Sequence, residues 1–163
     1  MITPIVMLLL MVGPYRILRS FPAARRRDFD GRGAAAVGLG LLFVFTSVGH
    51  FIQTAPMALM LPPWVPARIP LVYATGVLEF AIAAGFFVPR TRRLAGWAAA
   101  AVLVLFLPAN VYAALNHVPM GGHAWGPQYL LIRIPVQIMI LLWVYWFALR
   151  PINPAQQARP VNR

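Results

Sequence analysis

Four long runs of apolar residues dominate the hydropathy pattern of the chain. They cover residues 33–52, 70–88, 94–115 and 129–149. Each is close to the roughly 20 residues that a helix needs to cross about 30 Å of hydrocarbon. The pattern therefore predicts an all-α protein, a polytopic bundle of transmembrane helices.

A fifth apolar stretch, residues 1–18, is shorter and less regular. Pro4, Pro14 and Arg16 interrupt it, leaving about a dozen uninterrupted apolar residues, which is short for a span. It either crosses the membrane as an additional helix or lies in the interface. A removed signal peptide is disfavoured, because the stretch lacks a basic start and a small-residue cleavage site.

The chain then divides into three segments. Residues 1–32 form an N-terminal apolar helix followed by a basic cytoplasmic segment, and residues 33–150 form the four-helix transmembrane domain. The proline-containing tail, residues 151–163, is predicted to be a disordered cytoplasmic segment.

Polar side chains are rare within the predicted spans, and they recur at helical spacing. The sets that share a face are Thr46, His50 and Gln53; Gly76, Glu79 and Ala83; Asn110 and His117; and Arg133 and Gln137. Lipid cannot satisfy such groups, so we expect them to face inward. They predict a polar cavity in the outer half of the bundle.

Glu79 is the most informative of these residues, because a lone carboxylate at this depth is costly and needs a partner or a task. We expect it to pair with Arg133, directly or through His50 or water. Pro108 and Pro135 lie beside Asn110 and Arg133. Proline leaves a helical carbonyl without its donor, which favours a hydrated or ligand-lined pocket at this level.

Composition agrees with a membrane protein and indicates its orientation. The chain is 61% hydrophobic and only 10% charged, which excludes a soluble domain of 163 residues. Its net charge of +11 comes from arginines before the first certain span, at residues 90–93 and after the last span, and Arg68 alone lies in an opposite loop. This positive-inside pattern predicts cytoplasmic arginine-rich connections and a cytoplasmic C-terminus. Nucleic acid is not an expected partner.

The chain contains no cysteine, so it cannot build a thiol relay, a disulfide or an iron–sulfur cluster. Its three histidines lack the short spacing typical of metal ligands, so no metal is predicted. No cofactor is certain, and a quinone or a lipid remains a candidate. All basic side chains are arginine, and alanine, glycine and proline are abundant, which is typical of GC-rich bacterial coding.

Six ordered fragments resemble the pattern of DoxX-like membrane proteins. They are GHF at 49–51, PP at 62–63, TGVLE at 75–79, PRTRRL at 89–94, LPAN at 107–110 and RIPVQ at 133–137. The resemblance covers about residues 33–150 and implies a compact four-helix bundle of the bacterial inner membrane with residues 89–94 in a cytoplasmic loop. Its relatives are associated with thiosulfate and quinone oxidoreduction, with oxidative-stress complexes and, in animals, with the acetylcholine receptor chaperone NACHO.

Three functions remain open at this stage. In the first, a pocket binds the head group of a quinone, isoprenoid or lipid; its residues are Thr46, His50, Glu79, Asn110, Arg133 and Gln137. In the second, the chain is an assembly subunit or chaperone of another membrane protein, or a homo-oligomer, and the polar groups fix helix register. In the third, His50 and Glu79 act as acid and base in a membrane isomerase, so whether the protein is an enzyme stays open.

Overall fold

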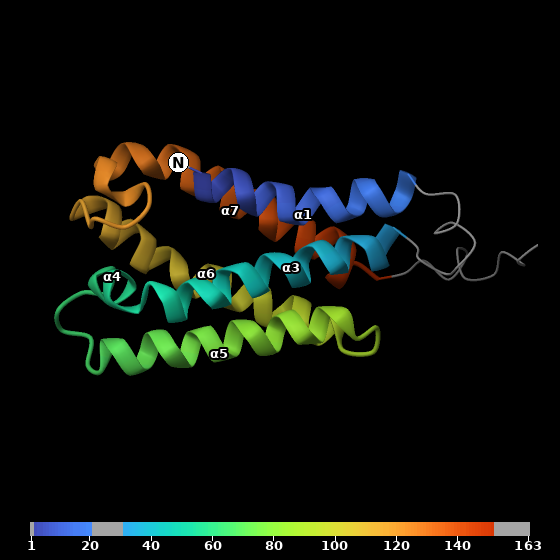
Figure 1. Ribbon diagram of the computed structural model, residues 1–163, viewed down its shortest axis with the longest axis horizontal. Coiled ribbons are helices and arrows are strands. Elements are labelled where there is room, and N and C mark those ends of the chain that lie inside the picture. The colour runs from blue at the N-terminus through green and yellow to red at the C-terminus, as the bar shows by residue number, and fades with distance from the viewer. Residues whose placement is uncertain (1, 21–30, 152–163) are drawn as a thin grey trace, which may run out of the picture.

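The computed structural model describes residues 2–20 and 31–151, which are helices joined by short connections. Most of the predicted basic segment, including Arg26, lies outside the described residues. The predicted disordered tail lies outside them as well, except for residue 151. Figure 1 shows the helices running along one common axis.

The helices of the described part follow the hydropathy pattern closely. They are α1 (Ile2–Ser20), α3 (Gly31–Ile52), α4 (Thr54–Leu59), α5 (Arg68–Phe87), α6 (Arg92–Leu115), the 3₁₀ segment η1 (His123–Tyr129), α7 (Leu130–Val144) and the π-helical segment η2 (Tyr145–Leu149). Four are long and apolar enough to span a membrane: α3, α5, α6 and the composite helix His123–Leu149. The prediction of an all-α bundle is confirmed, as is the prediction of four helices that can span a membrane. These four helices indicate a membrane protein.

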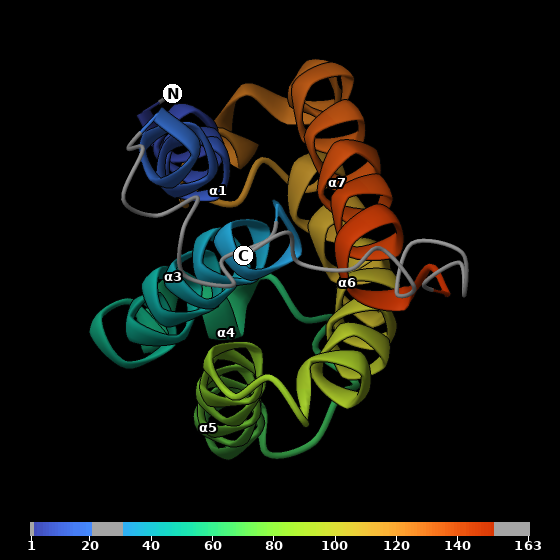
Figure 2. The ribbon, with the colours of Figure 1, turned by 90° about the vertical axis from the view of Figure 1, so that its right-hand side faces the viewer.

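Viewed along the bundle axis, the long helices form a ring (Figure 2). α1 packs on α3, α3 on α5, α5 on α6, and α6 on α7, which in turn touches α1. α5 therefore meets α3 and α6, whereas α7 meets α6 and α1. This order decides which polar residues can reach one another.

α1 runs antiparallel to α3 along the bundle axis (Figure 1). Met11 of α1 is fully buried, and its backbone carbonyl would overlap a Cβ placed at Gly38 of α3, so the close contact requires glycine there. This orientation is the one expected of a helix that accompanies the spans. A helix lying flat in the interface would require a different orientation.

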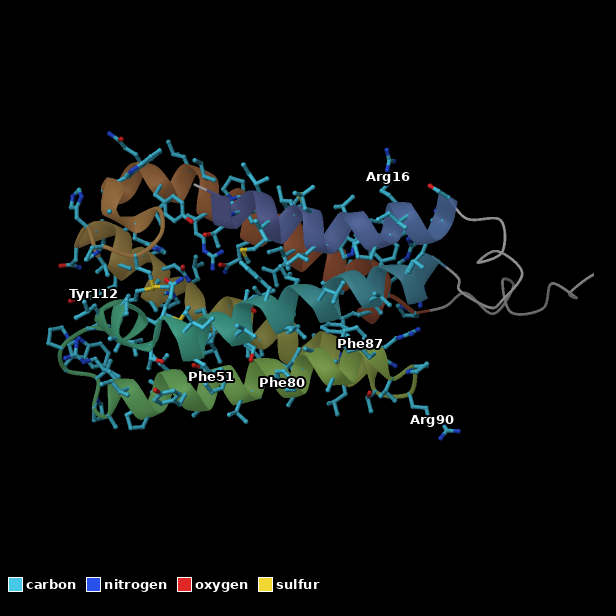
Figure 3. The ribbon with its side chains drawn as sticks, in the orientation of Figure 1. Arg16, Phe51, Phe80, Phe87, Arg90 and Tyr112 are labelled. Carbon is cyan, nitrogen blue, oxygen red and sulfur yellow. The ribbon has the colours of Figure 1, made fainter. Side chains whose placement is uncertain are left out.

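The connection between α5 and α6 is tight because its side chains complete the end of α5. The Thr91 hydroxyl donates to the Gly85 carbonyl at 2.9 Å, and Arg92 Nε donates to the Phe86 carbonyl at 3.2 Å. These carbonyls belong to the last turn of α5 and have no intrahelical donor. Arg16 and Arg90 lie at the same end of the bundle (Figure 3), where Arg32 donates to the Arg150 carbonyl at 2.9 Å.

The core near this arginine-rich end is apolar and closely packed. Its fully buried side chains include Met11, Leu39, Phe86, Ile140 and Val144. The rings of Phe43 and Phe86 join α3 to α5 with their centroids 5.9 Å apart. We call this part the apolar half, and the part that contains His50, Glu79, Asn110, Arg133 and Gln137 the polar half.

Candidate ligand-binding site

The first group of the polar half lies between α3 and α5. Ser47 Oγ donates to the Gly76 carbonyl at 2.8 Å, and His50 Nδ1 lies 3.0 Å from the Val72 carbonyl. Gly76 permits this approach, because a Cβ there would lie only 2.8 Å from the His50 Cβ. Polar side chains of α3 thus bind backbone carbonyls of α5.

His50 also faces the buried carboxyl of Glu79, with Nε2 3.6 Å from Oε2. A carbonyl only accepts hydrogen bonds, so the contact with Val72 assigns a proton to Nδ1. A neutral imidazole then presents the Nε2 lone pair to a carboxylate, and the contact is favourable only when one further proton sits on Nε2 or on Glu79. A shared proton, carried either by Nε2 or by Glu79, would therefore make this contact favourable.

Thr46 belongs to the same group. Its hydroxyl lies 3.2 Å from the Phe43 carbonyl and also reaches the Glu79 carboxyl. Three of the predicted site residues, Thr46, His50 and Glu79, are therefore brought together by α3 and α5.

The second group joins α6, η1 and α7 around Asn110. Asn110 Oδ1 accepts from Arg133 Nε at 3.0 Å and lies 3.2 Å from His123 Nε2, while Asn110 Nδ2 donates to the Phe106 carbonyl at 2.7 Å. The carbonyl on one side and the guanidinium on the other fix the orientation of the amide. Both the oxygen and the nitrogen of the Asn110 amide thus have partners within the chain.

Among the described residues, Arg133 has a strong hydrogen-bond partner only at Nε. Its Nη1 lies 3.9 Å from Met7 Sδ of α1, a weak acceptor, and no carboxylate of the described residues lies within 4 Å of the guanidinium. The side chain is partly exposed. N–H groups of the guanidinium therefore remain available for an additional acceptor.

The expected direct ion pair between Glu79 and Arg133 is wrong. Glu79 contacts His50 and Thr46, and Arg133 contacts Asn110, although the charges of Glu79 and Arg133 still interact at longer range. The ring order explains the difference, because α5 packs between α3 and α6 and places Glu79 against α3. Among the described residues His50 does not bridge to Arg133 either.

Gln137 lies one turn beyond Arg133 and is half satisfied. Its Nε2 donates to the Leu103 carbonyl of α6 at 2.7 Å. Its Oε1 is buried and has no donor among the described residues. Leu103 precedes Val104, whose carbonyl has no helical donor because of Pro108. Like Gln137 Oε1, Glu79 Oε2 is buried and has no hydrogen-bond donor in the described part of the chain.

Phe106 connects the two groups. Its ring lies 5.9 Å from the His50 imidazole, centroid to centroid, and its carbonyl binds Asn110. The α3–α5 group and the α6–α7 group are therefore neighbours across one aromatic side chain. They form a single polar layer within an otherwise apolar bundle.

Two residues of the predicted polar stripes lie outside this layer. Gln53 follows the end of α3 and is exposed, and His117 follows the end of α6, is exposed and has a positive φ of 50°. Both predictions are wrong, because helical spacing no longer applies beyond the end of a helix. Three participating residues were missed: Ser47, His123 and Thr75, whose hydroxyl lies 3.1 Å from His50 Nδ1. Ser47 lies three residues before His50 and could have been found by its spacing.

His123 could not have been placed from spacing alone. It begins η1, which folds back so that the imidazole lies beside Asn110 and packs edge-on against Tyr129, 4.8 Å between centroids. The turn depends on Gly126, whose φ is +79°. Within the described ranges, no three histidine or acidic side chains lie close enough to hold a metal ion.

An open apolar hollow occupies the end of the bundle opposite the arginine-rich end. It lies between α4 and the beginning of α5, and Pro56, Leu59, Pro63 and Ile69 line it together with Arg68. Its lining shares no residue with the polar layer. The hollow is thus a separate surface feature formed by the proline-rich connection.

The fold and the polar layer define a helical membrane protein with an ionisable cluster inside its bundle. Residues 39–148 match the family described as Domain of unknown function (DUF8561), and the chain belongs to this family. No curated protein and no solved structure matches the chain.

Proposed function

We propose that the protein binds a lipophilic molecule, a quinone, isoprenoid or lipid, whose polar head group enters the polar layer. Arg133 is the observation that carries this proposal. An arginine within a span is costly unless it is paired, and its strongest contact in the described part of the chain is the neutral Asn110. The guanidinium keeps N–H donors for a head group that supplies an acceptor oxygen.

Further support comes from the surroundings of Arg133. His50, Glu79 and Gln137 lie in the same layer, and the walls around them are aliphatic and aromatic side chains such as Phe106 and Tyr129. Ligand sites of this kind combine an apolar lining with a few convergent polar groups. The residues would hold the head group, and the apolar surface would hold the tail.

We also propose that the four spans form a DoxX-like core in the bacterial inner membrane, with the arginine-rich end and the C-terminus in the cytoplasm. The fragments that carry the resemblance support this proposal, because four of them contribute His50, Glu79, Asn110 and Arg133 to one layer. Arginines gathered at one end of the bundle support the orientation. Accessibility of a cysteine introduced beside Arg150 to a membrane-impermeant reagent would test it.

Native mass spectrometry of protein released from a mild detergent tests the ligand proposal. We expect a lipophilic adduct on the wild type and its loss from Arg133→Gln. Arg68→Gln is the matched control, because Arg68 is the first residue of α5, outside the polar layer, and in the described part of the chain its side chain donates to the Leu61 carbonyl alone, at 3.4 Å. Absence of an adduct from the wild type, or equal adducts on all three proteins at matched folding, would contradict the proposal.

A second candidate is an assembly subunit or chaperone, favoured by the hydrogen bonds that Asn110 makes within the chain. A network that is satisfied within the chain can fix helix register without binding a ligand. This candidate expects a membrane-protein partner that co-purifies reproducibly with wild type and with Arg133→Gln. Loss of the adduct without any change in partners would favour the ligand site instead.

A further inference from the structure

We propose that the head group recognised by the polar layer is one that donates a hydrogen bond, so that the ligand is a hydroxyl-bearing lipophile such as a long-chain isoprenoid alcohol. This inference rests on the proposed function and narrows its ligand class. A head group with acceptor oxygens alone, such as a quinone, an ether or an ester, would match the layer less well.

Gln137 provides the first argument. Its amide nitrogen is committed to the Leu103 carbonyl at 2.7 Å, so the orientation of the amide is fixed and Oε1 can only accept. Gln137 is 4% exposed, and no donor of the described residues reaches Oε1. A buried acceptor without a donor is costly, and a ligand that supplies the donor removes this cost.

The His50 and Glu79 pair provides the second argument, and it holds wherever the shared proton sits. With the proton on His50 Nε2, Glu79 Oε2 is a carboxylate oxygen 3.6 Å away, too far for a hydrogen bond. With the proton on Glu79, Nε2 keeps its lone pair, because the other ring nitrogen faces the Val72 carbonyl. In both states the pair presents one acceptor that lacks a donor, beside one N–H or O–H group that lacks an acceptor, and a hydroxyl can match both.

Several donors of the layer are directed at other acceptors. One N–H of the Asn110 amide donates to the Phe106 carbonyl, the Ser47 hydroxyl to the Gly76 carbonyl and Arg133 Nε to Asn110. Nη1 of Arg133 faces Met7 Sδ of α1 at 3.9 Å. Unsatisfied acceptors and an available cationic donor therefore occur in one layer.

A hydroxyl group is suited to such a layer, because it donates one hydrogen bond and accepts others through the same oxygen. It can donate to Gln137 Oε1 or to the acceptor of the His50 and Glu79 pair, while its oxygen accepts from a donor of the layer. A carbonyl or ether oxygen can only accept, so both orphan acceptors stay unmatched. The difference of one hydrogen bond to a buried, partly charged site corresponds to roughly 10- to 100-fold in affinity.

The decisive test compares two ligands with the same tail on the wild-type protein. Purified protein would be incubated with equimolar geranylgeraniol and geranylgeranyl methyl ether, and the two adducts would be quantified by native mass spectrometry. We expect at least a roughly 10-fold preference for the alcohol. Equal binding of both ligands would overturn this inference and leave the proposed function intact, whereas binding of neither, together with no native adduct, would overturn both.

Variants identify which acceptor causes the preference for the alcohol over the ether. Gln137→Leu removes one orphan oxygen, and Glu79→Leu removes the other, so we expect the preference for the alcohol to fall in each and to disappear in the double variant. Arg68→Gln is the control that should keep the full preference. An unchanged preference in a double variant that elutes and melts as the wild type would contradict the assignment, and Gln137→Met replaces Gln137→Leu should the latter fail to fold.

Discussion

The apolar and polar halves of the bundle use the same helices but satisfy different requirements. Near the arginine-rich end, Leu39, Phe86 and Ile140 are fully buried and interdigitate with small residues. In the polar half, the oxygen and the nitrogen of Asn110 both have partners, whereas Glu79 and Gln137 each keep a buried oxygen without a donor in the described part of the chain. Side-chain packing satisfies the apolar half, whereas hydrogen bonds within the described chain leave two buried oxygens of the polar half without a donor.

This difference indicates that the apolar half holds the bundle together and that the polar half is free to bind a ligand. Lipid tails are as apolar as leucine, so helices in a membrane associate through close packing and interhelical hydrogen bonds more than through the hydrophobic effect. The apolar half supplies this packing from α1 to α7. The polar half can therefore carry unsatisfied groups, provided that the apolar half maintains the fold.

The largest effect is expected from Phe86→Ala in the apolar half. Phe86 is 0% exposed and packs against Phe43, so its removal leaves a cavity that rigid neighbours cannot fill. We expect the free energy of unfolding to fall by about 3 kcal/mol, measured by reversible unfolding in mixed micelles with SDS. Phe80→Ala is the control, because Phe80 lies on the same helix and is 55% exposed toward the surroundings of the bundle. Equal losses for both variants would show that packing in this half is not decisive.

A somewhat smaller loss is expected from Gly38→Ala, which tests the attachment of α1. The new Cβ would overlap the Met11 carbonyl, so α1 must shift away from α3, at a cost of about 2 to 3 kcal/mol. Gly13→Ala is the control on α1, since a Cβ there meets no atom within 4 Å and alanine favours the helix. Unaltered stability of Gly38→Ala would mean that α1 is dispensable for the bundle.

Asn110→Ala should cost about 2 kcal/mol, because it removes the oxygen that accepts from the charged Arg133 guanidinium. The matched control on the same helix is Asn116→Ala. Asn116 also donates to a carbonyl four residues earlier, that of Tyr112 at 2.8 Å, but it is exposed. We expect less than about 0.5 kcal/mol for the control in the same unfolding assay. Similar losses of unfolding free energy in the two variants would contradict a structural role of the Asn110 network.

Sequence reasoning predicted the spans well because bilayer thickness sets their length. The predicted run 33–52 corresponds to α3 and 94–115 to α6, each within two residues at either end. The inward position of Gly76 and Glu79 on one face of α5 was also correct. The partner of Glu79 was not predictable from these patterns, because it depends on which helices are neighbours in the ring. Helical spacing could not reveal His123, which a 3₁₀ turn carries to Asn110.

The smallest change in stability is expected from Gln137→Met in the polar half, and it separates binding from folding most sharply. Methionine has a similar volume and fills irregular gaps, so the variant loses the hydrogen bond to the Leu103 carbonyl but also the buried oxygen that has no donor. The two effects oppose each other, and we expect the free energy of unfolding to change by less than about 1 kcal/mol in either direction. The preference for an alcohol over its methyl ether should nevertheless fall, because one orphan acceptor is gone. A loss as large as that of Phe86→Ala would instead place Gln137 among the residues that hold the bundle together, and the two halves would then differ in composition but not in role.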